Sequence, residues 1–223
     1  MDRPLPLPDL ARTLADIARL NGLFGGRRLT LFHLRRLVAG VPRGRAITVL
    51  DVGTGGADMP VAIARWARRA GRRVRIFALD RDPATLAVAR RAAARFPEIS
   101  FLRGDAQALP VRLHSVDAVI SALILHHLTP DEAARSIAEM DGASRAGFVV
   151  NDLARSRTAY ALVWIATRLV ATTRMARHDG PMSVRRAYTP DEVRALCEKA
   201  GVFAVDVLRY RCLARQCVVR ARP

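Results

Sequence analysis

The chain has 223 residues, of which 51% are apolar, so it can bury one substantial core, and we expect a single domain over residues 1–223. The formal net charge is +17 at pH 7, but it comes almost entirely from arginines that are scattered along the predicted helices without long runs, so we do not expect nucleic acid as the partner. Three cysteines without C-x-x-C spacing indicate neither a disulfide framework nor a zinc site, and no metal is predicted. The prolines near Met1 disfavour an export signal, so a cytoplasmic protein is expected.

Strand-like and helix-like segments alternate along the chain. Residues 8–40 predict two amphipathic helices around Gly25-Gly26. The following segments are, in order, strand 46–50, helix 60–70, strand 74–79, helix 83–96, strands 100–103 and 116–121, a helix from Thr129, strand 147–150, a helix from Thr189, and an antiparallel pair at 205–209 and 216–220. This order predicts an α/β fold with a doubly wound, seven-stranded, mostly parallel, Rossmann-like sheet.

Three helix starts are marked by capping residues. Asp82 precedes Pro83, and both Thr129-Pro130-Asp131-Glu132 and Thr189-Pro190-Asp191-Glu192 match a capping box with proline at the first helical position. We divide the domain into an N-terminal helical lid (1–40), a cofactor-binding core (45–150), a helical insertion (155–188) and a C-terminal helix with a strand pair (189–223). The lid and insertion either cover the ligand at the strand ends or serve only as packing helices.

A glycine-rich turn follows the first strand and carries two carboxylates. Asp51, Gly53, Thr54, Gly55 and Asp58 lie between that strand and a helix, where backbone amides can approach a nucleotide closely. A dinucleotide would place its pyrophosphate at the helix N-terminus, where Asp58 would repel it. The two acids therefore favour a ligand that carries positive charge at the turn.

Two further acids end the next strands. Asp80 ends the second strand, where a carboxylate can accept both ribose hydroxyls, and Asp105 follows the third strand beside Ala106, where it can accept a hydrogen bond from an adenine amine. Carboxylates at three successive strand ends, combined with the glycines, predict an adenosyl ligand that has a cationic end and no phosphate. S-adenosylmethionine has these properties.

On these residues the chain resembles the class I S-adenosylmethionine-dependent methyltransferases over roughly residues 45–220. The resemblance implies that Asp51, Gly53 and Gly55 hold the methionine part of the cofactor, Asp80 the ribose, and Asp105 with Ala106 the adenine. The remaining candidate cofactor residues are Thr54, Asp58, Arg81 and Ser121. The sequence departs from many members at Ala57, where they have a third glycine.

Two local motifs resemble the small-molecule branch of that family, which includes quinone-biosynthesis and polyketide-tailoring enzymes. They are Leu109-Pro110 and Leu125-His126-His127-Leu128. No Asn-Pro-Pro-Tyr motif follows the fourth strand, which disfavours the branch that methylates amino groups of nucleic acids. We therefore expect methylation, at oxygen, of a small phenolic, quinone or polyketide-like acceptor in secondary metabolism. The alternatives are an RNA methyltransferase and a nicotinamide-binding oxidoreductase.

Methyl transfer to a hydroxyl needs alignment of the acceptor oxygen with the methyl group and the sulfur of the donor, and it needs a group that accepts the hydroxyl proton. The candidate bases are His127, His126 and Asp152, and only one of the adjacent histidines is expected to face the site. The candidate substrate-binding residues are Asn151, Arg155, His178, Arg186 and Tyr188. The stretch 178–188 is interpreted either as a loop that forms part of the substrate wall or as a solvated surface loop. The apolar segment 160–172 lies among arginines, which is consistent with a hydrophobic substrate, with contact to a membrane surface, or with a dimer face, so the protein is expected to be a monomer or homodimer.

Overall fold

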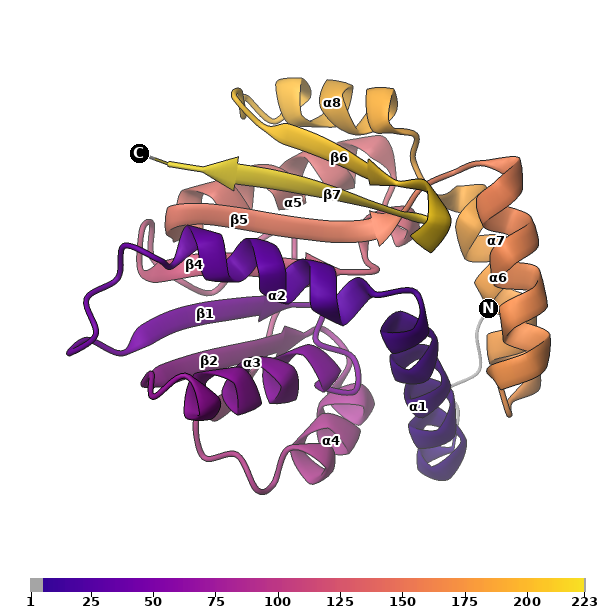
Figure 1. The fold of residues 1–223 in the computed structure, drawn as a ribbon, viewed down its shortest axis with the longest axis horizontal. Coiled ribbons are helices and arrows are strands. Elements are labelled where there is room, and N and C mark those ends of the chain that lie inside the picture. Colours follow the sequence, from indigo (N-terminus) through magenta and orange to yellow (C-terminus); the bar gives the residue numbers. More distant parts are fainter. Residues whose placement is uncertain (1–5, 223) are drawn as a thin grey trace.

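A central seven-stranded sheet organises the computed structural model, which describes residues 6–222 (Figure 1). Its strands are β1 (Ile47–Val52), β2 (Val74–Asp80), β3 (Ile99–Arg103), β4 (Val116–Ala122), β5 (Ser144–Leu153), β6 (Asp206–Tyr210) and β7 (Arg215–Ala221). The spatial order is β3-β2-β1-β4-β5-β7-β6, and only β7 runs antiparallel to its neighbours. The predicted doubly wound, mostly parallel sheet is confirmed.

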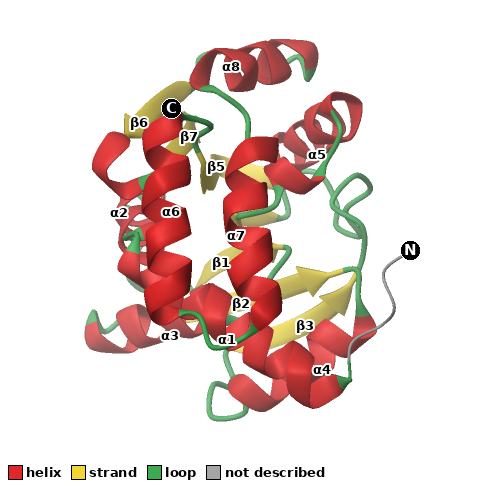
Figure 2. Cartoon of the chain, turned by 90° about the vertical axis from the view of Figure 1, so that its right-hand side faces the viewer, coloured by secondary structure: helices red, strands yellow, loops and turns green. Residues whose placement is uncertain are grey.

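Helices cover both faces of the sheet. The helices are α1 (Leu7–Leu23), α2 (Gly26–Leu37), α3 (Asp58–Arg69), α4 (Pro83–Ala92), α5 (Pro130–Ala143), α6 (Arg157–Val170), α7 (Arg174–Arg186) and α8 (Pro190–Lys199), with short 3₁₀ turns η1 (Leu125–His127) and η2 (Arg211–Leu213). Side chains of α2, α3 and α4 pack into the core on one face, and those of α5 and α8 into the core on the other. Figure 2 shows α6 and α7 side by side with α1 next to them, at one end of the strands.

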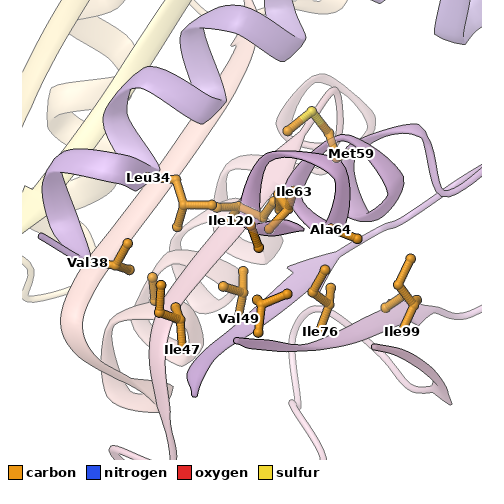
Figure 3. Close-up of a cluster of buried hydrophobic side chains, with 14 of the residues drawn as sticks. Leu34, Val38, Ile47, Val49, Met59, Ile63, Ala64, Ile76, Ile99 and Ile120 are labelled. Atoms are coloured by element: carbon orange, nitrogen blue, oxygen red, sulfur yellow. The ribbon is translucent and has the colours of Figure 1, made fainter. Parts of the chain in front are cut away.

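Apolar side chains of the central strands pack against those of the helices on both faces. Figure 3 shows Val49 of β1 and Ile76 of β2 facing Ile63 of α3, and Ile120 of β4 near Leu34 of α2. Each of these side chains is fully buried, which contributes about 1.5–3 kcal/mol per residue to folding. This packing fixes the relative positions of the strand ends, on which the polar residues of the site lie.

The predicted helix starts agree with the structure. Asp82 caps α4 by accepting hydrogen bonds from the amides of Ala84 and Thr85, and Thr129 and Thr189 each form a capping box with the glutamate three residues later. Helix α4 is shorter than predicted and ends at Ala92. A proline disfavours the helical conformation of the residue that precedes it, which here is Phe96 before Pro97. Phe96 instead packs against the core as part of a turn.

The segment predicted as a loop at 178–188 is a helix over most of its length. Helix α7 continues through Gly180 and Pro181. Gly180 lies against α6, because a Cβ atom there would be 2.6 Å from Thr167 Cγ2. The glycine therefore permits the two helices to approach closely, and this tertiary contact outweighs the weak local preference of the segment for a helix.

Candidate active site

A cavity of about 370 Å³ lies at the C-terminal ends of β1, β2, β3 and β4. One part of its wall is polar and consists of Asp51, Gly53, Thr54, Gly55, Gly56, Asp58, Asp80, Arg81, Thr85, Gly104, Asp105, Ala106 and Gln107. The other part consists of Leu14, Ile17, Ala18 and Asn21 from α1, with Ala122, Leu123, Ile124, His127 and Leu128 from the segment after β4. The cavity thus joins a carboxylate-rich end to a mainly apolar end.

The glycine-rich turn adopts conformations that its residue types make accessible. Gly53 has φ +71°, and a Cβ atom there would lie 1.8 Å from Ile124 Cδ1, so only glycine fits. Ala57, the position where many class I members have glycine, also takes a left-handed conformation with φ +62° as the residue that precedes α3. An alanine adopts this conformation at a cost of about 1–2 kcal/mol, and the turn keeps its shape despite the departure.

Three buried carboxylates at the polar end have raised pKa values. Burial raises the pKa of Asp51 to about 7, and the negative charges of Asp58 and Asp80 contribute in the same direction. Burial also raises the pKa values of Asp58 and Asp80 above their usual range. A cation placed among these groups would stabilise each carboxylate in its charged form. It would therefore lower their pKa values and offset both the burial and the neighbouring negative charges.

Unsatisfied polar atoms at this end match the requirements of such a ligand. Among residues 6–222, Asp51 Oδ2, Thr54 Oγ1 and Asn21 Oδ1 are buried without a hydrogen-bond partner. Native structures leave few buried polar atoms unpaired, and a bound ammonium and hydroxyl groups would satisfy these acceptors. The residues present therefore fit S-adenosylmethionine.

The acids after β2 and β3 are already partly organised by backbone amides. Asp80 Oδ2 accepts a hydrogen bond from Gly55 N at 3.1 Å, and its Oδ1 accepts one from Asp82 N, also at 3.1 Å. Asp105 is exposed and accepts a hydrogen bond from Gln107 N at 2.9 Å. These contacts fix the orientation of both carboxylates at the cavity wall.

Of the two adjacent histidines, His127 lines the cavity and His126 is buried behind it. Their rings are stacked at a tilt, with centroids 4.1 Å apart. Burial, together with neighbouring cationic side chains, lowers the pKa of His127 to about 4, so this imidazole is neutral near pH 7. A neutral imidazole retains a free lone pair and can accept a hydrogen bond from a hydroxyl group in the cavity.

Asp152 forms a hydrogen bond with His126 on the side away from the cavity. The two atoms His126 Nδ1 and Asp152 Oδ1 are 2.7 Å apart, and both side chains are almost completely buried. Burial acts to raise the pKa of Asp152, but the charge and hydrogen bond of His126 outweigh it, so the pKa lies below its usual value. The fully buried guanidinium of Arg215 adds positive charge near both Asp152 and Asp58. Asp152 is thus part of a buried charge cluster and lies outside the cavity wall.

The structure places several predicted residues away from the cavity. Asn151 lies within β5 and donates hydrogen bonds to Gly26 O (2.9 Å) and Thr30 Oγ1 (3.0 Å), so it attaches the sheet to α2 and is not available to a substrate. Ser121 is buried within β4. The predictions for both residues are corrected. Strand β5 extends beyond the predicted 147–150 and so takes Asn151 into the sheet, whereas Ser121 lies in the strand as predicted but its side chain is buried and does not line the cavity.

The predicted substrate-binding roles of Arg155 and of residues in the stretch 178–188 are also corrected. Tyr188 donates its hydroxyl to Leu128 O at 2.7 Å and so anchors the segment after His127. His178 is exposed beside Asp179 on α7, and Arg155 pairs with Glu192 and lines a separate groove. Arg186 lies at the exposed end of α7 and influences His127 by its charge alone. None of these four residues lines the cavity in the described part of the chain.

Sequence reasoning missed the apolar wall. Leu14, Ile17 and Ala18 precede Asn21 on α1 at helical spacing, and this periodicity was a readable signal that one helix face contacts the cavity. Leu123, Ile124 and Leu128 lie on either side of the histidines and also line the cavity. No helical or strand periodicity predicts this, because their positions depend on the short 3₁₀ turn between them.

Comparison with known proteins agrees with this architecture. Residues 49–147 match a family model described as a methyltransferase domain. A segment of 70 residues is 40% identical to the 2-phytyl-1,4-naphtoquinone methyltransferase of Thermosynechococcus vestitus, covering 31% of this chain and 29% of that protein, so the match spans less than a third of the relative.

Two solved structures show the same fold at low identity. A SAM-dependent methyltransferase from Aquifex aeolicus is 18% identical, with a TM-score of 0.56 over 90% of this chain and 95% of that one. The CMeT domain of the citrinin polyketide synthase is 17% identical, with a TM-score of 0.59 over 83% of this chain and 49% of that one.

Proposed function

We propose that this chain, which carries the domain of the class I S-adenosylmethionine-dependent methyltransferases, methylates a small phenolic, quinone or polyketide-like acceptor, with oxygen as the acceptor atom. The family implies S-adenosylmethionine as the methyl donor. The single observation that carries the proposal is the shape of the cavity, which joins carboxylates at three strand ends to an apolar compartment that contains His127.

The polar residues would hold the donor by complementary charge and hydrogen bonding. Asp51 and Asp58 would face its ammonium group, Asp80 its ribose hydroxyls, and Asp105 its adenine amine. When bound, S-adenosylmethionine supplies a methyl group on a positively charged sulfur. The apolar residues Leu14, Ile17, Leu123, Ile124 and Leu128 would exclude water and surround a flat or aliphatic acceptor.

His127 would orient the acceptor rather than ionise it in a separate step. A phenol has a pKa near 10, and transfer of its proton to an imidazole with a pKa of about 4 would cost about 8 kcal/mol. The neutral imidazole can instead accept a hydrogen bond from the hydroxyl and align its oxygen. As that oxygen gains the methyl group its proton becomes strongly acidic, and the same imidazole nitrogen would then take it up. This role is consistent with the position of His127 on the cavity wall.

Binding and transfer can be tested separately. Calorimetry should show binding of S-adenosylmethionine and no binding of NAD. Binding of NAD would instead favour the oxidoreductase alternative. Asp80→Ala should weaken that binding about 10- to 100-fold, because it removes charge-assisted hydrogen bonds. Asp191→Ala, an exposed carboxylate on α8, is the matched control. Unchanged affinity of the Asp80 variant would refute the assignment of the ribose contact.

A screen for transfer of a labelled methyl group to phenols, quinones and polyketide-like compounds tests the acceptor class. Mass spectrometry of the product identifies the methylated atom. Transfer to carbon or nitrogen alone would contradict the proposed O-methylation, and the absence of transfer to any compound of these classes would contradict the acceptor class.

One observation favours RNA methylation as a second candidate. Contrary to the expected scatter, arginines concentrate on one face: α2, α3 and α4 carry nine arginines and a single acid, Asp58. Arg27, Arg28, Arg35, Arg65 and Arg69 line an open groove of about 780 Å³ between α2 and α3. Incorporation of methyl groups into RNA, with affinity that falls steeply as salt rises, would support this candidate over the small-molecule acceptor.

A further inference from the structure

Helix α6 exposes an unusual combination of side chains on its outer half. The residues Ala159, Val163, Ala166 and Thr167 are buried against the rest of the molecule. The opposite half exposes Tyr160 (38%), Trp164 (41%), Ile165 (49%) and Leu169 (80%), interleaved with Arg157 and Arg168. At 100° per residue these side chains share one half of the helix surface, so the helix presents a continuous apolar and basic face to its surroundings.

The charges around this face are mostly positive. Helices α6 and α7 together contain Arg157, Arg168, Arg174, Arg177, Arg185 and Arg186 but a single acid, Asp179. Arg168 lies over the ring of Trp164 at 3.6 Å from its centroid, an arrangement that keeps the guanidinium beside the apolar face. A surface with apolar anchors and arginines complements an interface that is both apolar and negatively charged.

A groove at the N-terminal end of α6 adds a site for an anionic group. It has a volume of about 610 Å³ and is lined by Arg155, Ser156, Arg157, Tyr160, Val184 and Arg185. Arg155 pairs with Glu192, whereas Arg157 and Arg185 form no ion pair with any residue in the described range 6–222. Two guanidinium groups and the hydroxyl of Tyr160 are donors suited to a phosphate group.

We propose that the outer half of α6 docks on an anionic lipid bilayer, with the groove between α6 and α7 receiving a lipid phosphate. No helix among residues 6–222 is long and apolar enough to cross a membrane. Helix α6 has 14 residues, so it lies in the interface, with Trp164, Ile165 and Leu169 inserted among the acyl chains. Because α6 packs against α1, which lines the cavity, docking brings the apolar end of the site close to the lipid.

The basic face formed by α2, α3 and α4 is a weaker candidate for this role. Its exposed side chains are mainly arginines, and Phe32 is its one large apolar side chain exposed beyond half of its surface in the described chain. Arginines alone attract anionic lipid at low salt, but they do not insert into it. Insertion therefore distinguishes the two faces.

Vesicle sedimentation and tryptophan fluorescence test the proposal. The chain has two tryptophans, so Trp66→Phe leaves Trp164 as the single reporter. With vesicles of phosphatidylcholine containing about 30% phosphatidylglycerol, we expect sedimentation of the protein and a blue shift of Trp164 emission. Pure phosphatidylcholine vesicles should bind at least several-fold more weakly, because the arginines then lack negative partners.

Variants of exposed residues identify the face that binds. Trp164→Gln combined with Leu169→Gln should reduce binding to anionic vesicles at least 10-fold, and Arg157→Gln combined with Arg185→Gln should reduce it several-fold. Leu113→Gln, at a position that is 77% exposed on another part of the surface, is the matched control and should bind like the parent. Unchanged affinity for S-adenosylmethionine confirms that all variants are folded.

Three outcomes would overturn the proposal. They are no sedimentation with anionic vesicles, binding that persists in the Trp164 and Leu169 double variant, and binding lost only when Arg65 and Arg69 are replaced by glutamine. Each outcome is independent of methyl transfer, so the docking proposal and the proposed activity can fail separately.

Discussion

At the scale of single residues, the raised pKa of Asp51 predicts that ligand binding at the polar end of the cavity is coupled to proton release. Asp51 has a pKa of about 7 because it is buried beside other carboxylates, so about half of the protein carries a proton there at pH 7. An ammonium group binds the ionised form better. Binding of S-adenosylmethionine should therefore expel this proton, and the affinity should rise with pH through this range.

The first prediction concerns this linkage. Between pH 7 and pH 6 the affinity for S-adenosylmethionine should fall about five-fold, and Asp51→Asn should bind more weakly with little pH dependence. Calorimetry in two buffers of different ionisation enthalpy measures the released proton directly. If the heats agree between buffers at pH 6.5, Asp51 is already ionised in the free protein and the argument fails.

The second prediction concerns His127. Because its pKa is about 4, the rate of methyl transfer with saturating donor should not depend on its titration between pH 6 and 8. His127→Ala should lower kcat/KM about 100-fold, and His127→Gln, which retains a hydrogen-bond acceptor, should recover part of the loss. His178→Ala, an exposed histidine outside the cavity, is the control. A kinetic pKa near 6.5 that disappears in His127→Ala would contradict this assignment.

The third prediction concerns the buried charge cluster behind the histidines. Asp152→Asn removes the negative charge that His126 and Arg215 share, which should destabilise the protein by about 3–5 kcal/mol. Since the folded-state pKa of Asp152 is lowered, its contribution is fully present above about pH 4 and is lost as the pH falls through the folded value. Urea unfolding at pH 7 measures the effect of the substitution, and comparison with unfolding below about pH 3 measures the pH dependence. Asp179→Asn, an exposed carboxylate, should change stability little, and a loss below 1 kcal/mol for Asp152→Asn would mean that the cluster rearranges.

At the scale of elements, one aspartate joins α1 to the connection between α6 and α7. Asp16 accepts hydrogen bonds from the amides of Thr172 (2.9 Å) and Thr173 (2.8 Å), and from both threonine hydroxyls. Burial acts to raise the pKa of Asp16, but these hydrogen bonds outweigh it and hold the pKa below its usual value. The N-terminal helix and the insertion, which are far apart in sequence, thus form one connected layer beside the cavity.

The fourth prediction tests whether this layer acts as a lid. Asp16→Ala should weaken the attachment by about 1–3 kcal/mol, because it leaves the threonine donors without their acceptor. Hydrogen exchange should then accelerate in α1 and at 172–173, and the affinity for S-adenosylmethionine should fall because α1 lines the cavity. Arg12→Ala, an exposed change on the same helix, is the control. Faster exchange without any loss of affinity would indicate that these helices only pack.

At the scale of the whole molecule, the sheet separates the charges. The face formed by α2, α3 and α4 carries nine arginines against one acid, whereas α5 and α8 on the other face carry seven acids against three basic residues. A distribution of this kind gives the molecule a strong dipole and directs polyanions to one side. The net charge of +17 alone does not reveal this arrangement.

The fifth prediction follows from this asymmetry. Replacement of Arg28, Arg35, Arg65 and Arg69 by glutamine should markedly lower the salt concentration at which the protein elutes from a heparin column. Replacement of four arginines elsewhere, Arg75, Arg103, Arg112 and Arg209, changes the net charge equally and should have a smaller effect. Equal shifts for the two sets would mean that the total charge governs polyanion binding.

The sequence alone determined the order of the strands and of the helices other than α7, the cofactor class and most of the polar end of the site. These features are local: the apolar periods, the capping residues and the acids at strand ends each act within a few residues, and a parallel sheet necessarily brings its strand ends to one edge. Asp51, Asp58, Asp80 and Asp105 accordingly lie on one cavity, as the sequence indicated.

Only the tertiary structure decided the acceptor end and the distribution of charge. Asn151 and Tyr188 proved to be anchors because their hydrogen-bond partners, Gly26 and Leu128, lie far away in the sequence. The apolar wall, the pairing of His126 with Asp152 and the contact of Asp16 with the α6–α7 connection depend in the same way on distant segments. No local pattern encodes such contacts, because they form only when the packed sheet fixes where each helix lies.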